Sequence, residues 1–191
     1  MPGAYQVRVT AAGTTVTRPI EVRMDPRLKG VSAADLQAQF ELATKIRDRV
    51  SAANDAVLRI RRLRSEAADR VARARAEPVT RAADAATLKL REVEERLYQV
   101  RNRSGQDPLN FSIKLNNRLA ALGRSVQTGD ARPTAAAYRV YDELSGELDR
   151  ELQQLDRVVA GEVAGLNRIL STRGLPPVSG QGAARRSGPG Q

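Results

Sequence analysis

The feature that most constrains the fold is an apolar stripe that recurs every three or four residues from Leu36 to Ala74. This spacing places the stripe on one face of an α-helix. Ser32 and Asp35 form a capping-box-like start just ahead of it, and Pro78 stops the helix. An unbroken helix of this length is on the order of 60–65 Å long at 1.5 Å per residue. Because its stripe must be buried, the rest of the chain has to supply helices that pack along it.

Three further stripes of the same period cover residues 79–100, 107–126 and 133–174. The last ends at Gly174, a residue suited to a left-handed helix terminus. The two middle helices together span nearly the length of either long one. The sequence therefore predicts a mainly α fold, an elongated antiparallel helical bundle of three layers whose middle layer is broken at residues 105–108. A four-helix up-down-up-down bundle is the alternative, but it would leave half of the first helix unburied.

Residues 5–24 alternate as β-strands do and predict a β-hairpin with a Gly-containing turn. Its apolar side chains fall in phase on one face: Tyr5, Val7, Val9, Val16, Ile20 and Val22. Two strands alone are marginally stable because they lack a second layer. Tyr5 lies where an immunoglobulin-like or fibronectin-like sandwich has a tyrosine that anchors a corner through its hydroxyl. We expect the hairpin to be the remnant of such a sandwich, cut by a truncated start; a hairpin that simply caps the bundle is the alternative.

These patterns divide the chain into three parts. Residues 1–27 form the hairpin that ends a β-sandwich, residues 28–174 form the helical bundle, and residues 175–191 are expected to be a disordered tail because they are rich in Gly, Ser, Pro, Gln and Arg. No run of 18 apolar residues predicts a transmembrane segment. Residues 1–6 carry no export signal.

Composition limits the chemistry available to this chain. It has no His, no Cys and no Trp. This excludes zinc sites of the usual types, Ser-His and Cys nucleophile systems, iron–sulfur clusters and disulfides. Carboxylates, Lys, Tyr and hydroxyl groups remain. No catalytic, cofactor-binding or metal-ligating residue is predicted.

The formal net charge is +10, and the basic residues are densest on the first long helix. They are Arg59, Arg61, Arg62, Arg64, Arg70, Arg73 and Arg75. Such a stretch could bind nucleic acid or an anionic surface. Acidic residues interrupt it at Glu66, Asp69 and Glu77, and no aromatic side chains accompany it for base stacking. We therefore favour a solvated helix face laced with salt bridges.

Two other groupings are interpreted as structural. The carboxylates at Glu92, Glu94 and Glu95, and at Asp142, Glu143 and Glu147, lie among arginines and are typical of surface charge pairs. Segment 109–120 contains three Asn residues near a helix start. Asn is a poor helix former, but its amide can cap backbone groups, so this segment predicts a fixed corner of the bundle.

Several short motifs in combination resemble the C-terminal end of large bacterial BNR-repeat β-propeller proteins, often labelled glycosyl hydrolase, sialidase-like or sortilin-like. The resemblance covers residues 1 to about 178 and rests on Tyr5–Thr10, Asp25–Arg27, Asp35–Phe40, Leu115–Leu122, Gly129–Asp130, Pro133–Thr134, Leu166–Asn167 and Gly174–Pro176. In that family a propeller comes first, a β-sandwich segment follows, and a helical region closes an exported protein. This chain contains no Asp-box repeat, so no catalytic residue can be carried over.

The resemblance implies a non-catalytic structural and interaction module whose partner is the propeller portion of a parent protein or another protein. The alternative is a stand-alone basic helical protein that binds nucleic acid or another polyanion. A homo-oligomer paired through the first helix is a third hypothesis. The resemblance implies export, whereas the missing signal leaves the compartment open.

Overall fold

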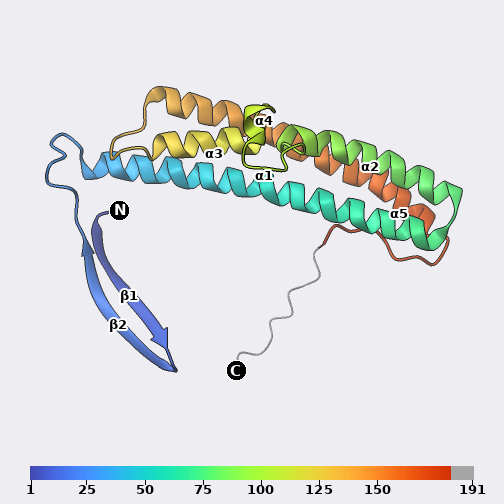
Figure 1. Cartoon of the computed structure of the whole chain (residues 1–191), viewed down its shortest axis with the longest axis horizontal. Coiled ribbons are helices and arrows are strands. Elements are labelled where there is room, and N and C mark those ends of the chain that lie inside the picture. The colour runs from blue at the N-terminus through green and yellow to red at the C-terminus, as the bar shows by residue number, and fades with distance from the viewer. Residues whose placement is uncertain (182–191) are drawn as a thin grey trace.

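The computed structural model describes residues 1–181 of the chain. Two antiparallel strands, β1 (Gly3–Ala11) and β2 (Thr14–Val22), come first. The helices that follow are α1 (Ala33–Ala74), α2 (Glu77–Leu97), α3 (Leu115–Val126), α4 (Ala135–Val158) and α5 (Ala164–Ser171). The fold is mainly α with an amino-terminal β-hairpin, as predicted (Figure 1).

The helices form three layers along one axis. α1 runs the length of the bundle, while α2 and α3 follow one another along it in the opposite direction (Figure 1). α4 and α5 return along α3 and then α2. The middle layer is therefore broken rather than reversed, as the helix lengths predicted. The up-down-up-down alternative was wrong, because α2 and α3 run in the same direction.

The core is built from small and medium side chains, which lets the layers approach closely. The buried residues of α1 include three alanines, Ala53, Ala56 and Ala67, and α2 adds Ala83 and Ala86. Leucine, isoleucine and valine fill the remaining positions of a single core that spans all the helices. No large aromatic side chain is needed to bring these layers together.

The start of α1 agrees with its sequence signal. The Ser32 Oγ accepts a hydrogen bond from the Asp35 N–H at 3.2 Å, and the Asp35 carboxylate accepts one from the Ser32 N–H at 3.0 Å. Both halves of the capping box are thus present. α1 ends at Ala74 because Arg75 takes a left-handed conformation with φ 45°.

The connection between α2 and α3 differs from the expectation. The helix predicted to begin at Asp107–Pro108 begins at Leu115, and residues 107–109 form only a single 3-10 turn. The carboxylate of Asp107 accepts hydrogen bonds from the N–H groups of Arg103 and Ser104, so it caps the turn that precedes it. Leu115 is buried in the core, and this packing sets where α3 starts.

α4 and α5 are one continuous rod interrupted by a π-helical turn at Val159–Val163. The rod ends in a Schellman motif: the Leu175 N–H donates to the Leu170 carbonyl at 3.1 Å, and the Gly174 N–H donates to the Ser171 carbonyl at 3.1 Å. Gly174 has φ 66°, in agreement with its predicted role as a left-handed terminator.

Residues 175–181 correct the expected boundary of the disordered tail. They lie along α1 and α5, and Val178 is only 3% exposed within the core cluster. Composition alone predicted disorder, but side chains of two helices satisfy the backbone of this segment. The remainder of the predicted tail, residues 182–191, lies outside the described residues.

Candidate functional site

The apolar face of the hairpin is the most distinctive exposed surface of the molecule. Cross-strand pairing joins Tyr5 to Ile20 and Val9 to Val16 on this face. Between 42% and 58% of each side chain in the set remains exposed: Tyr5, Val7, Val9, Val16, Ile20 and Val22. Both strands are exposed along their whole length, and the hairpin projects from the start of α1 (Figure 1). The helical bundle therefore does not provide a second layer for these six side chains, and the alternative of a bundle-capping hairpin was wrong.

The two edges of the hairpin differ in their hydrogen-bonding capacity. Ala12 and Gly13 have φ 48° and 77° and form a two-residue turn, which makes Ala11 and Thr14 a hydrogen-bonded closing pair. Pairs alternate along an antiparallel ladder, so Pro19, opposite Gln6, falls in a non-hydrogen-bonded pair. Its nitrogen therefore faces the outer edge of β2 and cannot donate there.

The outer edge of β1 carries no such interruption. Ala4, Gln6, Arg8 and Thr10 occupy the non-hydrogen-bonded positions of β1, so their backbone N–H and C=O groups point away from β2. An unpaired row of donors and acceptors is a template for another strand. The hairpin thus has one apolar face, an outer edge of β2 that Pro19 interrupts, and an outer edge of β1 that is able to accept a strand along its length.

Tyr5 also forms the contact expected of a corner tyrosine. Its hydroxyl donates a hydrogen bond to the backbone carbonyl of Met1 at 2.6 Å. In sandwich domains a corner tyrosine makes this type of bond to backbone a few residues upstream. The bond fixes the entry into β1. That the hairpin belongs to a larger sandwich stays a prediction.

The arginines of α1 serve mainly as ties within the bundle. Arg61 and Arg64 each donate to the carboxylate of Glu94 on α2 at 2.7 Å. Arg59 pairs with Asp156 of α4 at 3.2 Å. The others contact nearby groups of the chain: Arg62 bonds the Gly180 carbonyl, Arg70 bonds Asp69 and the Pro176 carbonyl, Arg73 bonds Asp69, and Arg75 ends the helix.

Glu94 departs from the surface role predicted for its group. It is only 3% exposed, whereas its neighbour Glu95 is exposed. Two guanidinium groups from α1 compensate its burial, and Arg61 also lies 5.0 Å from the centre of the Tyr98 ring. Glu94 follows Val93 on the buried face of α2. The period of the apolar residues in the sequence therefore already indicated that Glu94 lies on this face.

The other carboxylates lie on the helix surfaces. Glu92 pairs with Lys89 three residues earlier at 3.2 Å. Glu147 pairs with Arg118 of α3 at 2.7 Å, so it joins two helices rather than two turns of one. Asp142 and Glu143 are exposed on α4. The structure does not bring these groups together into a single site.

The Asn-rich segment fixes the break in the middle layer through one of its three asparagines. Asn116 is 6% exposed, and its Nδ2 donates to the Oδ1 of Asn54 on α1 at 3.2 Å. The loop backbone is held by other side chains, since Gln99 Nε2 donates to the Ser112 carbonyl at 2.8 Å. Asn116 thus anchors α3 to α1, but the amide caps expected at the helix start are not formed, because no side chain caps the first N–H groups of α3.

Three carboxylates outside the bundle core have lowered pKa values, each from local backbone and side-chain hydrogen bonds. Bonds from Arg27 lower the pKa of Asp25, bonds from Ser32 lower that of Asp35, and the N–H groups of Arg103 and Ser104 lower that of Asp107. All three stabilise turns or helix starts. Among residues 1–181, no group of three or more acidic side chains is arranged to hold a metal ion.

Within the same residues, no helix combines the length and the apolarity needed to cross a membrane. Comparison with models of protein families, with curated proteins and with solved structures found no match. The resemblance to the C-terminal end of BNR-repeat propeller proteins therefore stays a prediction from the sequence motifs.

Proposed function

We propose that this chain is a structural and interaction module in which a helical strut presents a β-hairpin to the β-sheet of a partner. The observation that carries the proposal is the exposed apolar face of the hairpin, with six large side chains that the bundle leaves uncovered. Exposed apolar surface of this kind marks interaction sites in soluble proteins. The partner that the sequence motifs favour is the propeller portion of a BNR-repeat parent protein, and another protein is the alternative.

The size of the hairpin indicates how the partner binds. Nine-residue strands that rise about 3.4 Å per residue and lie about 4.8 Å apart give a face on the order of 300 Å². A stable interface buries about 800 Å² on each partner. The face alone is therefore too small for a stable homodimer of hairpins. A partner sheet that both covers the face and adds a strand to β1 would bury more surface and satisfy the free edge.

The arginine ties argue for this function over polyanion binding. Arg61, Arg64 and Arg59 are committed to carboxylates of other helices. A polyanion would have to compete with these pairs. Polyanion binding can be recognised by its salt dependence, because the affinity for a DNA duplex would fall steeply as salt is added. A fluorescent duplex titrated with the chain at low salt tests it directly, and tight, salt-sensitive binding would favour the polyanion function.

The decisive experiment compares two proline variants of the full chain. Arg8→Pro and Thr17→Pro replace residues that lie opposite one another in a non-hydrogen-bonded pair, so both should preserve the β1–β2 ladder. Arg8→Pro removes a donor from the open edge of β1. Thr17→Pro is the matched control, because it alters the edge of β2 that Pro19 already interrupts.

The readout is in-cell cross-linking from a photoreactive residue at Gln6, followed by mass spectrometry of the joined peptides. We expect cross-links to a strand of one β-rich partner sequence, lost in Arg8→Pro and kept in Thr17→Pro. Cross-links that persist equally in both variants, or that join Gln6 only to helices of this chain, would contradict the proposal.

A further inference from the structure

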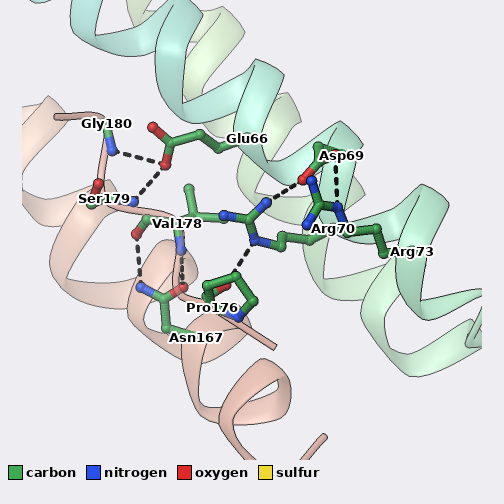
Figure 2. A network of polar contacts seen from close by, with 9 residues as sticks. All are labelled: Glu66, Asp69, Arg70, Arg73, Asn167, Pro176, Val178, Ser179 and Gly180. Carbon is green, nitrogen blue, oxygen red and sulfur yellow. Dashed lines mark hydrogen bonds and ion pairs between the residues drawn. The ribbon is translucent and has the colours of Figure 1, made fainter. Parts of the chain in front are cut away.

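Residues 175–181 run as an extended segment along α1 and α5, toward the opposite end of α1 from the hairpin (Figures 1 and 2). We call the surface of α1 and α5 that this segment contacts the groove. The segment has no helix or strand of its own. Val178 is its anchor and enters the core, while the flanking residues Pro177 and Ser179 are exposed. Its backbone must therefore find hydrogen-bond partners among the side chains of the groove.

Asn167 of α5 recognises the backbone of Val178 in both directions. Its Nδ2 donates to the Val178 carbonyl at 2.9 Å, and its Oδ1 accepts from the Val178 N–H at 2.8 Å (Figure 2). A side-chain amide that bonds both groups of one residue imitates a neighbouring β-strand. Because this contact involves only backbone groups of the segment, it requires an extended conformation but no particular side chain.

Side chains of α1 hold the segment on either side of Val178. The Glu66 carboxylate accepts from the N–H groups of Ser179 at 2.7 Å and Gly180 at 3.2 Å. Charged acceptors strengthen such bonds. Figure 2 shows these contacts with Val178 between them and Asn167.

Two arginines complete the main-chain contacts. Arg70 Nε donates to the Pro176 carbonyl at 2.8 Å, and Arg62 Nε donates to the Gly180 carbonyl at 3.0 Å. The Asp69 carboxylate bonds both Arg70 and Arg73, which orients the Arg70 guanidinium toward the groove (Figure 2). The side chains of the groove thus bond backbone groups at four residues of the segment.

Selectivity comes from two positions of the segment. Val178 fills a space in the core, 3% exposed. Gly180 has φ 64°, and a Cβ added there would lie 2.7 Å from Leu63 Cγ, closer than real Cβ contacts allow. Position 180 therefore accepts only glycine without a shift of Leu63. The two prolines ahead of Val178 favour the extended approach to the groove.

We propose that the groove between α1 and α5 is a peptide-binding site for extended segments of the form Pro-Pro-Val-x-Gly, and that residues 175–181 occupy it as an intramolecular ligand. Backbone recognition by side chains together with a valine pocket and a glycine-only position is the arrangement by which proteins bind extended peptides. The site can then accept the same segment from a separate molecule when its own is displaced. It lies about 45 Å along α1 from Asp35, at 1.5 Å per residue, and does not depend on the hairpin.

The test uses the full chain with Val178→Asp, which puts a carboxylate into an apolar pocket and expels the intramolecular segment. The probe is a fluorescein-labelled peptide with the sequence of residues 175–181, titrated by fluorescence anisotropy. We expect saturable binding to Val178→Asp. The unmodified chain should bind at least about tenfold more weakly, because its own segment is present at an effective concentration in the millimolar range.

Matched variants in the Val178→Asp background identify the groove. Asn167→Ala removes both bonds to the valine backbone and should weaken peptide binding about tenfold, which corresponds to about 1.4 kcal/mol. Asn110→Ala changes an exposed asparagine of the α2–α3 loop and should leave binding unchanged. A peptide with Ala at the position of Gly180 should bind at least about tenfold more weakly because of the clash with Leu63.

Two results would overturn the proposal: a folded Val178→Asp chain that binds no peptide, or binding that Asn167→Ala does not alter. Circular dichroism melting establishes whether the variant is folded. If Val178→Asp unfolds the bundle, Gly180→Ala displaces the segment with a single methyl group and is measured in the same way, with the same expected outcome. Because the hairpin takes no part, these results leave the proposed docking of the hairpin untouched.

Discussion

At the scale of single residues, the buried ion pairs show how a strongly basic chain keeps its layers in register. Glu94 brings two arginines of α1 onto α2 at 2.7 Å each. The guanidinium groups remain partly exposed, with side-chain exposures of 47% and 32%, so water reduces their cost of burial. The carboxylate itself depends on both partners because it is almost completely buried.

Replacing Glu94 should therefore destabilise the bundle more than replacing the neighbouring carboxylate. We expect Glu94→Ala to lower the free energy of unfolding by about 2 kcal/mol, since it leaves a void and two partly buried arginines without an anion. Glu95→Ala, an exposed control, should change it by less than about 0.5 kcal/mol. Urea unfolding followed by circular dichroism measures the free energy of unfolding of both variants. Equal changes would show that the contacts of Glu94 with its two arginines add no more stability than an exposed carboxylate does.

The residues of the peptide groove lacked a local sequence signal. Gly180 lies in a stretch whose composition predicted disorder, and its need for glycine arises from Leu63, more than a hundred positions earlier. Asn167 forms hydrogen bonds with the backbone of Val178, and no pattern of side chains in the sequence predicts such a contact. Glu94 was different, because its place on the apolar face of α2 was readable from the helix period.

At the scale of elements, the boundaries that local chemistry controls were predicted and those that packing controls were not. The capping box of α1, the Gly-containing hairpin turn and the glycine after α5 each rest on residues within a few positions. The start of α3 at Leu115, which is buried in the core, and the π-helical turn at Val159–Val163, which lies against α2, were not predicted. No residue close in the sequence marks these two boundaries unambiguously, so they become visible only in the tertiary structure.

Acid should weaken the elements that carboxylates cap. The folded-state pKa values of Asp35 and Asp107 are lowered from 3.8 by hydrogen bonds to Ser32 and to the Arg103 and Ser104 N–H groups. Each carboxylate thus contributes stability that is fully present above pH 3.8 and is lost as the pH falls through the lower folded-state value. We expect the melting temperature to fall as the pH is lowered through this window.

The variants Asp35→Asn and Asp107→Asn separate this effect from general acid denaturation. Each should reduce the fall in melting temperature between about pH 5 and pH 2, because the amide cannot titrate. Asp142→Asn on the exposed face of α4 is the matched control. Thermal melts across the pH range measure all three, and an unchanged slope in both capping variants would contradict the role of these carboxylates.

At the scale of the whole molecule, the structure joins two parts of unequal stability. The bundle has one continuous core through all its helices, and the segment 175–181 adds Val178 to that core. The hairpin buries none of its large apolar side chains. A two-stranded ribbon without a second layer is marginal in water. The part that would bind a partner is therefore the part least stabilised by the rest of the chain.

This difference predicts two classes of backbone hydrogen exchange. Amides of β1 and β2 should exchange close to the rate of unstructured peptide, whereas amides of α1 between Leu42 and Leu63 should exchange only through global unfolding. Hydrogen–deuterium exchange of the full chain followed by mass spectrometry measures both. Hairpin amides that exchange together with those of α1 would mean that the hairpin is stabilised by the bundle after all.

The sequence by itself determined the mainly helical class, the hairpin, the long first helix and the three-layer order, because periodicity and capping are local and helix lengths limit how layers can match. Only the tertiary structure decided that Arg61 and Arg64 meet at Glu94, that α3 begins at Leu115, and that residues 175–181 lie in the groove. These features depend on groups distant in the chain that meet only when the layers pack. A backbone segment of disordered composition becomes ordered where other helices supply its hydrogen-bond partners.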